Sequence, residues 1–372
     1  MSDRLKPSRM ELRLEAEIAG AATAIDADCK RAELAGYHAR LGRFDEAKST
    51  IAALHHRYDS RPNVAISSWV NLVEGLIGHF SDMDPAARDK VLRAHALSTA
   101  AGLTSMRALS AAWLANMDYC RLDVLAMSDH VRESFRLSNS THDEIRSRAC
   151  MVVAQALHLS GKYMQSVAWY QRVRLHANRI GDDATLGAVL HNMAWLHMAT
   201  LRQEKFTGTV NSAVASFALA SAESTKNFDD IFGVRTLPSL VPILRAQVLS
   251  LKGRAAEALL LYEAHLTGPH YRGAMRFRAN LFADQAWCRI AMGDHAGALQ
   301  DATAALSSLC LQVQVDDLAA AHTRLSQVFS ALGNVNDAEK HGLLAAKAWG
   351  TFANLQLQIS INLDGLCENF SN

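Results

Sequence analysis

Histidine is the residue type in this sequence that most invites a chemical role, because the chain has 16 of them. Imidazole nitrogens are common zinc ligands, and two of them at positions i and i+4 of a helix with a nearby carboxylate form a typical site. The most closely spaced pairs are His55/His56, His191/His197 and His265/His270. None of these pairs has that spacing together with a carboxylate partner. The sequence therefore predicts no metal site, and isolated histidines on the surface or in a groove are the simpler interpretation.

Motifs of nucleotide-dependent and hydrolytic enzymes are missing from the sequence. It contains no GxxxxGK[ST] phosphate-binding loop, no GxGxxG after a strand, no HExxH and no GxSxG. The six cysteines are scattered, none lies in a CxxC pair, and reduced thiols packed as small apolar side chains are expected. We therefore expect neither an enzyme nor a bound cofactor.

The composition favours helices that bury a large apolar surface. Hydrophobic residues make up 49% of the chain, and only 6 of its 372 residues are proline, which breaks helices. The formal charge is +1, which argues against a broad attraction to nucleic acid or to an anionic membrane. The N-terminus has no apolar stretch typical of a secretory signal, and no run is long and apolar enough to predict a membrane span. These features predict a cytoplasmic protein.

One pattern recurs along the chain: an apolar helix, a glycine, and a second helix with a small residue five positions after the glycine. The glycines of the five clear copies are Gly42, Gly161, Gly253, Gly293 and Gly333, and the small residues are Ala47, Ser166, Ala258, Ala298 and Ala338. A glycine ends a helix readily because it reaches the left-handed backbone region without a Cβ clash. The small residue lets the two helices approach closely. The last three glycines are evenly spaced, and further turns are expected near Ser81, Arg121 and Leu201.

This pattern resembles the tetratricopeptide repeat (TPR) family over about residues 28–350. The usual repeat has about 34 residues, whereas the period here is near 40, and the usual proline after the second helix is missing. The chain is most similar to the long-repeat variety, found in the sensor region of the maltose-regulon transcription activator and in bacterial signalling proteins. HEAT and armadillo arrays have periods of about 40–47 residues, but the step from glycine to small residue favours the TPR interpretation. The resemblance implies an all-α, right-handed superhelical solenoid of about eight TPR-like hairpins.

The pattern also divides the chain into parts. A capping helix is expected within residues 1–27, with its helical part over 9–25. The repeat array follows over 28–350, with an irregular insertion at about 203–239 that includes a helix at about 210–224. A second capping helix is expected over 351–372.

The expected C-terminal helix contains an ambiguous signal. Leucine and isoleucine alternate strictly from Leu355 to Leu363, which fits a strand by its period. A helix would place Leu355, Ile359, Leu363 and Leu366 on one face. We predict a helix, because a single strand has no partner in an all-helical array.

The resemblance implies that ligands bind the concave face, which fixed positions of each first helix line in TPR proteins. Counting back from the turns, and adding adjacent polar residues, gives Asn71, Arg148, Gln155, His158, His191, Asn192, Trp195, Asn280, Asp284, Trp287, Arg324 and Gln327. Amide and guanidinium groups in this set can hydrogen-bond a peptide backbone or a carboxylate. Chaperone-binding members of the family use a Lys/Asn clamp for a C-terminal carboxylate. This sequence lacks a matching set of lysines, so we do not assign that function to it.

Two tryptophans, Trp195 and Trp287, occupy the same repeat position. Tryptophan and arginine are enriched as binding anchors, but ordinary packing between helices explains both tryptophans equally well. If Arg148 and Arg324 lie exposed in the groove, replacing either by alanine should change stability by less than about 0.5 kcal/mol.

The resemblance implies a protein- or peptide-binding scaffold that works as a sensory or regulatory module in bacterial signalling. Its ligand is a protein or peptide in the concave groove, and no direct contact with nucleic acid or membrane is expected. A structural assembly subunit is the first alternative, and an exposed apolar stripe outside the groove would favour it. An enzyme with a site in the groove is the second. The sequence also leaves open whether two copies of the chain pair as a homodimer.

Overall fold

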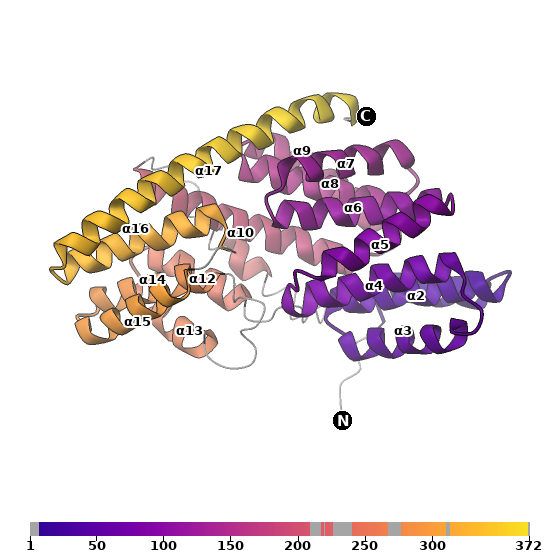
Figure 1. Ribbon diagram of the computed structural model, residues 1–372, viewed down its shortest axis with the longest axis horizontal. Helices are drawn as coiled ribbons and strands as arrows, with labels where there is room; N and C mark the ends of the chain where they lie inside the picture. Colours follow the sequence, from indigo (N-terminus) through magenta and orange to yellow (C-terminus); the bar gives the residue numbers. More distant parts are fainter. Residues whose placement is uncertain are drawn as a thin grey trace.

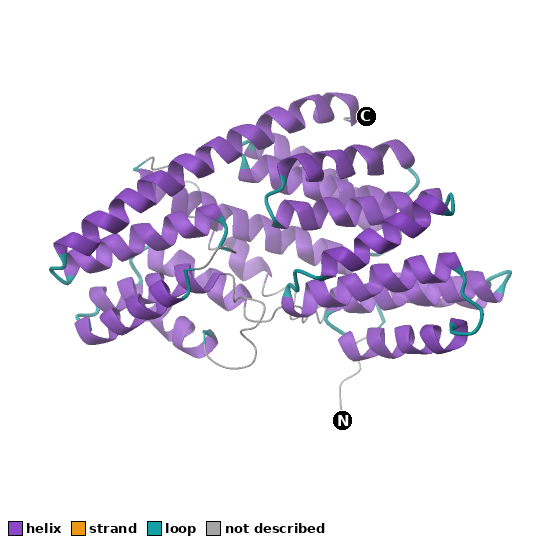
Figure 2. Cartoon of the chain, viewed as in Figure 1, coloured by secondary structure: helices purple, strands orange, loops and turns teal. Residues whose placement is uncertain are grey.

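A computed structural model describes residues 7–208, 217–218, 220–225, 240–266, 277–309 and 313–370. Figure 2 shows helices joined by short turns, with no strand in any of the described ranges. This arrangement confirms the predicted all-α class and is consistent with an α solenoid of stacked hairpins. Within the described ranges, no helix combines the length and the apolar character needed to cross a membrane.

The hairpins follow one another along the chain, as the change of colour in Figure 1 shows. The helices are α1 (Arg9–Ala19), α2 (Ala24–Leu41), α3 (Phe44–Tyr58), α4 (Val64–Asp82), α5 (Ala87–Ala100), α6 (Thr104–Cys120), α7 (Val124–Leu137), α8 (Asp143–Leu159), α9 (Tyr163–Ile180), α10 (Asp183–Thr207), α12 (Leu240–Leu251), α13 (Ala255–His265), α14 (Arg278–Ala291), α15 (His295–Ser307), α16 (Val315–Ala331) and α17 (Val335–Phe370). Paired helices such as α8 and α9, or α16 and α17, pack against each other.

The turn glycines have the backbone conformation that the repeat pattern predicts. All five are left-handed, with φ between 77° at Gly253 and 83° at Gly161, where a Cβ would be strained. Four of the small residues that follow, Ala47, Ser166, Ala258 and Ala298, are completely buried. Ala338 is half-buried, because α17 belongs to the last hairpin and has no following hairpin to cover it.

The turn predicted near Leu201 is wrong. Helix α10 continues through this position and ends at Gly208, whose φ is 82°. Leu201 and Arg202 are 4% and 1% exposed, so packing favours a continued helix where the sequence has neither glycine nor proline. Most of the predicted insertion at 203–239, including most of the helix predicted at 210–224, lies outside the described residues.

Both predicted capping helices have different boundaries in the structure. The helix predicted over 9–25 stops at Ala19, because Thr23 begins a new helix by accepting a hydrogen bond from the backbone N–H of Asp26. The C-terminal segment 351–372 is no separate element, since α17 runs without interruption from Val335 to Phe370. The prediction of a helix over the alternating leucines and isoleucines is confirmed.

The length of α17 lets it reach back across the array. Figure 1 shows it passing over the top of the molecule, from α16 towards α7 and α9. Its C-terminal part contacts α7 and α8, where Ile359, Leu363 and Leu366 join the apolar cluster of those helices. The last hairpin is thereby attached to the third and fourth.

Candidate functional site

The first helices of the hairpins surround a central cavity of about 210 Å³. Its walls come from α2, α4, α6, α8, α10, α12 and α16, and all of these except α10 are the first helices of described hairpins. Phe277, directly before α14, completes the wall. This arrangement places the cavity where the repeat pattern puts the concave face. We call this space the central cavity below.

Five of the twelve candidate residues lie in the wall of the central cavity: Arg148, Gln155, His191, Asn192 and Trp195. Gln155 and Trp195 are one repeat period apart and occupy equivalent positions of successive first helices. Asn116, which the sequence analysis missed, precedes Gln155 by nearly the same interval in the same wall. Arg40 was also missed, although it lies two residues before the turn glycine Gly42 and the repeat spacing could have identified it.

Arg148 is the most unusual member of the cavity wall. Its side chain is buried, and its guanidinium carbon lies 3.8 Å from the centre of the Trp113 ring. Its one hydrogen bond among the described residues is a long one of 3.4 Å, donated by Nη2 to Oγ1 of Thr185. Burial, and then the neighbouring Arg40, lower the pKa of Arg148 to about 9. The guanidinium therefore lacks the counter-charge that a buried cation usually has.

The middle of the cavity wall is polar but uncharged. Burial lowers the pKa of His191 to about 4, so its imidazole is neutral at physiological pH. The Oε1 atom of Gln155 is buried without a hydrogen-bond partner among the described residues. Trp195 covers one side of the space, with its ring 4.8 Å from that of Phe277. Such a wall can pair with a polar ligand and stack against it.

The candidate residues of the last two first helices form a second group, in which Asn280, Asp284 and Arg324 are buried. Arg324 donates from Nε to Oδ1 of Asp284 at 2.7 Å and from Nη1 to Oε1 of Gln327 at 2.9 Å. Its guanidinium lies 5.3 Å from the centre of the Trp287 ring, and Trp287 packs in an apolar cluster. Asn280, also buried, donates to Asp317 at 3.3 Å. None of these five residues lines the central cavity.

The condition under which replacing Arg148 or Arg324 would hardly change stability, an exposed guanidinium, is not met. Arg148 is 7% exposed and Arg324 is 4% exposed. The reason is that α10 and α17 bring hairpins together that are far apart in the sequence, so side chains of the concave face become covered. Removing either guanidinium perturbs a buried polar group rather than a solvated one.

A buried ion cluster next to the central cavity was not predicted. Arg202 of α10 donates to Oδ2 of Asp316 and to Oδ1 of Asp317, both at 2.8 Å. Asp316 also lines the central cavity. Burial and the neighbouring Asp317 raise the pKa of Asp316 to about 6. The partners are far apart in the chain, and neither repeat spacing nor a motif connects them.

Two candidates lie elsewhere. Asn71 borders a separate, more open depression with His55 and Tyr58, and its amide donates to the backbone carbonyl of Ser67 at 2.8 Å. The ring of His158 is 4.9 Å from that of Tyr163 and 5.0 Å from that of His197. In the described part of the chain, no three or more His, Cys, Asp or Glu side chains gather closely enough to hold a metal ion.

No protein-family model matches the chain, and no curated protein matches it significantly. The resemblance to TPR proteins thus depends on the repeat pattern, the left-handed turn glycines and the buried small residues. A function has to be argued from the central cavity itself.

Proposed function

We propose that the chain is a cytoplasmic scaffold of TPR-like repeats, wound as a right-handed superhelix, that binds a peptide or a segment of a partner protein in the central cavity. One observation carries the proposal: first helices from both halves of the array enclose a cavity whose wall contains an uncompensated cation and, among the described residues, an unpaired buried acceptor. Buried polar groups without partners are costly in a folded protein. A ligand that pairs with them regains part of that free energy on binding.

The position of the cavity supports a sensory or regulatory role. A bound ligand contacts Arg148 and Gln155 on α8 as well as Asp316 on α16. These helices belong to the fourth and to the last hairpin, and α10 contacts both of them. A ligand that touches both hairpins stabilises the arrangement in which they lie together, so binding shifts the population of conformations towards that arrangement.

An assembly subunit, the first alternative, would be favoured by an apolar stripe outside the groove. The large exposed apolar side chains of α17 are Val335, Leu343, Leu344, Leu357 and Ile361. Leu343 and Ile361 are separated by a whole number of helical turns, so they share a face. Lys347, Gly350 and Asn354 lie between them on that face. The stripe is interrupted, and ligand binding in the cavity remains the better supported function.

Peptide binding in the cavity is tested with a library of tri- and tetrapeptides, half with free termini and half capped at both ends. We expect wild-type protein to retain members of the library, detected by mass spectrometry after gel filtration. The variant Ala199→Phe should lose at least about tenfold in retention, because Ala199 lines the cavity one turn after Trp195 and a phenyl ring there fills the space.

The matched control is Ala353→Phe, at an exposed position of α17. It should retain the same peptides as wild type, and both variants should melt within a few degrees of it. Equal retention by Ala199→Phe and wild type, or no retained peptide at all, would contradict the proposed function.

A further inference from the structure

Two buried guanidiniums, those of Arg40 and Arg148, meet at one place in the wall of the central cavity. Both donate to Oγ1 of Thr185, Arg40 from Nη1 at 3.1 Å and Arg148 from Nη2 at 3.4 Å. The buried Asp182 accepts from Nη1 of Arg40 at 2.6 Å. Burial alone would raise the pKa of Asp182, but Arg40 holds it below its usual value. The ionised Asp182 therefore neutralises Arg40 and leaves Arg148 without a counter-charge.

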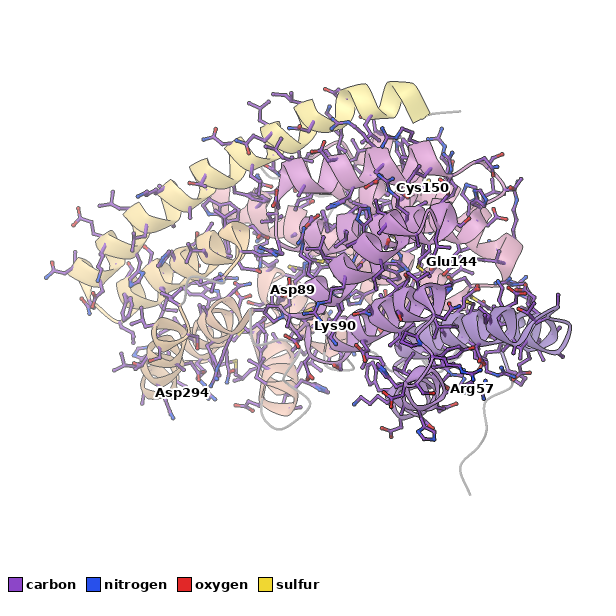
Figure 3. All side chains as sticks on the ribbon, turned by 45° about the vertical axis from the view of Figure 1, so that its right-hand side comes forward. Arg57, Asp89, Lys90, Glu144, Cys150 and Asp294 are labelled. Atoms are coloured by element: carbon purple, nitrogen blue, oxygen red, sulfur yellow. The ribbon has the colours of Figure 1, made fainter. Side chains whose placement is uncertain are left out.

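Glu144 does not supply the missing negative charge. It lies one turn before Arg148 in α8, and Figure 3 shows it among the packed helices of the N-terminal half, whereas Arg57 and Asp294 lie at the periphery. Burial, and then the nearby Glu33, raise the pKa of Glu144 to about 8, so its carboxyl is mostly protonated at neutral pH. This part of the cavity wall consequently carries one uncompensated positive charge.

The donors of Arg148 are available to a ligand. Its guanidinium carbon lies 3.8 Å from the centre of the Trp113 ring, so the ring covers one face of the flat group and leaves the N–H groups at its edge. The long bond to Thr185 is the only hydrogen bond that Arg148 makes with the described residues. Its side chain is 7% exposed and lines the central cavity. A buried, charged donor that opens onto a cavity can fix the orientation of a ligand.

The neighbouring wall offers a second donor and leaves room for a small group. Asn116 lies three residues after Trp113 in α6, on the same face of the helix, and it lines the cavity. Its amide N–H groups can donate to an anion. On α10, Gly187 and Ala188 follow Thr185 closely and also line the cavity. Neither has a side chain larger than a methyl group, so the wall beside Thr185 is not filled from these positions.

The size of the unpaired charge selects among anions. A carboxylate carries a single negative charge, and its two oxygens match two N–H groups of a guanidinium. A phosphate monoester carries about −1.5 to −2 at neutral pH, which would leave excess negative charge beside the buried Asp182. The uncompensated cation therefore favours a carboxylate.

We propose that Arg148 is the anchor of a carboxylate subsite in the central cavity, at which one carboxylate group of a ligand pairs with the guanidinium beside Trp113. The inference rests on the proposed function and names the group by which a peptide or partner segment is held. The carboxylate is a C-terminus, an Asp or Glu side chain, or a free small acid, since all three present the same group. The subsite involves only side chains of α2, α6, α8 and α10, so it sets no lower limit on the length of the ligand.

The test compares tripeptides with free ends, tripeptides amidated at the C-terminus and tripeptides acetylated at the N-terminus. Each form is prepared as one set that contains Asp or Glu and one that lacks both. The amidated set without Asp or Glu has no carboxylate, and wild-type protein should retain it at least about tenfold less than the peptides with free ends. Acetylation should have no effect of this size. Retention of the amidated set with Asp or Glu would assign the subsite to a side chain, and its loss would assign it to the C-terminus.

Arg148→Met removes the guanidinium and keeps an apolar side chain in its place. The variant should retain peptides with and without a carboxylate equally. It should melt within a few degrees of wild type, because the charge that it removes has no full partner. Arg148→Lys keeps the charge and should keep the preference for carboxylates. Arg254→Met, at an exposed position, is the matched control and should behave as wild type.

The outcomes separate the subsite from the proposed function. If wild type retains the carboxylate-free set as well as the peptides with free ends, the subsite is wrong and peptide binding stands, whether or not Arg148→Met folds. An unchanged preference in a folded Arg148→Met would also overturn the subsite.

Sodium acetate, compared with sodium chloride at the same concentration, tests the free acid. If no peptide is retained but acetate raises the melting temperature of wild type and not that of Arg148→Met, the proposed function fails and the subsite stands. If no peptide is retained and acetate has no effect, both proposals fail.

Discussion

Replacing Arg202 by methionine is expected to destabilise the chain by about 3–5 kcal/mol, because removing one partner of a buried ion pair leaves an uncompensated charge. Arg202 is 1% exposed and holds both Asp316 and Asp317 at 2.8 Å. Without the guanidinium, two adjacent buried carboxylates face each other without a cation between them. Urea unfolding of wild type and variant at pH 8 measures the difference.

The loss should shrink in acid. The pKa of Asp316 is already raised to about 6 in the folded protein, so the folded state binds a proton more tightly than the unfolded state. The stability that this proton supplies is complete below about pH 4 and disappears as the pH rises through about 6. Without Arg202 the pKa rises further, and protonation at pH 5 relieves the repulsion.

The variant should therefore be much closer to wild type at pH 5 than at pH 8. Arg254→Met, which removes an exposed partner of Glu257, is the matched control and should leave the midpoint unchanged at both pH values. A deficit below about 1 kcal/mol, or one of the same size at both pH values, would show that the ion cluster does not join α10 to α16.

Replacing Leu363 by alanine is expected to cost about 2–5 kcal/mol, the usual range for a buried leucine that leaves a cavity. Leu363 is completely buried in the cluster that α17 forms with α7 and α8. The matched control is Ile361→Ala, two residues earlier and 63% exposed, which should change stability by less than about 0.5 kcal/mol.

Hydrogen exchange then shows where the effect is located. Because α17 covers α7 and α8, Leu363→Ala should speed amide exchange in α7 as well as in the C-terminal part of α17. Unchanged exchange in α7 would mean that the end of α17 is not attached to the earlier hairpins.

The sequence predicts local features of this fold well and distant contacts poorly. Gly42, Gly161, Gly253, Gly293 and Gly333 end their helices as predicted, because the left-handed turn is a property of the residue and its immediate neighbours. The continuation of α10 past Leu201 depends on what covers that helix. The same holds for α17, which extends past residue 351 over an apolar surface supplied by α7 and α8.

In the candidate site, too, the sequence predicts which positions recur with each repeat, but it does not predict contacts between distant hairpins. Repeat spacing identifies Gln155 and Trp195 in the cavity wall and could also have identified Asn116, since one structural position recurs with each repeat. Spacing gives no information on which inner residues become covered. Asp284 and Arg324 belong to different hairpins and form an ion pair. Their pairing cannot be predicted from spacing, because it depends on how the two hairpins pack against each other.

The most direct test of the central claim, that the cavity enclosed by the first helices is the ligand site, is a crystal structure of the full chain with the most strongly retained peptide. The account predicts electron density for the peptide inside the cavity, beside Trp195 and Gln155. A peptide bound on the outer helices, with only solvent in the cavity, would contradict it.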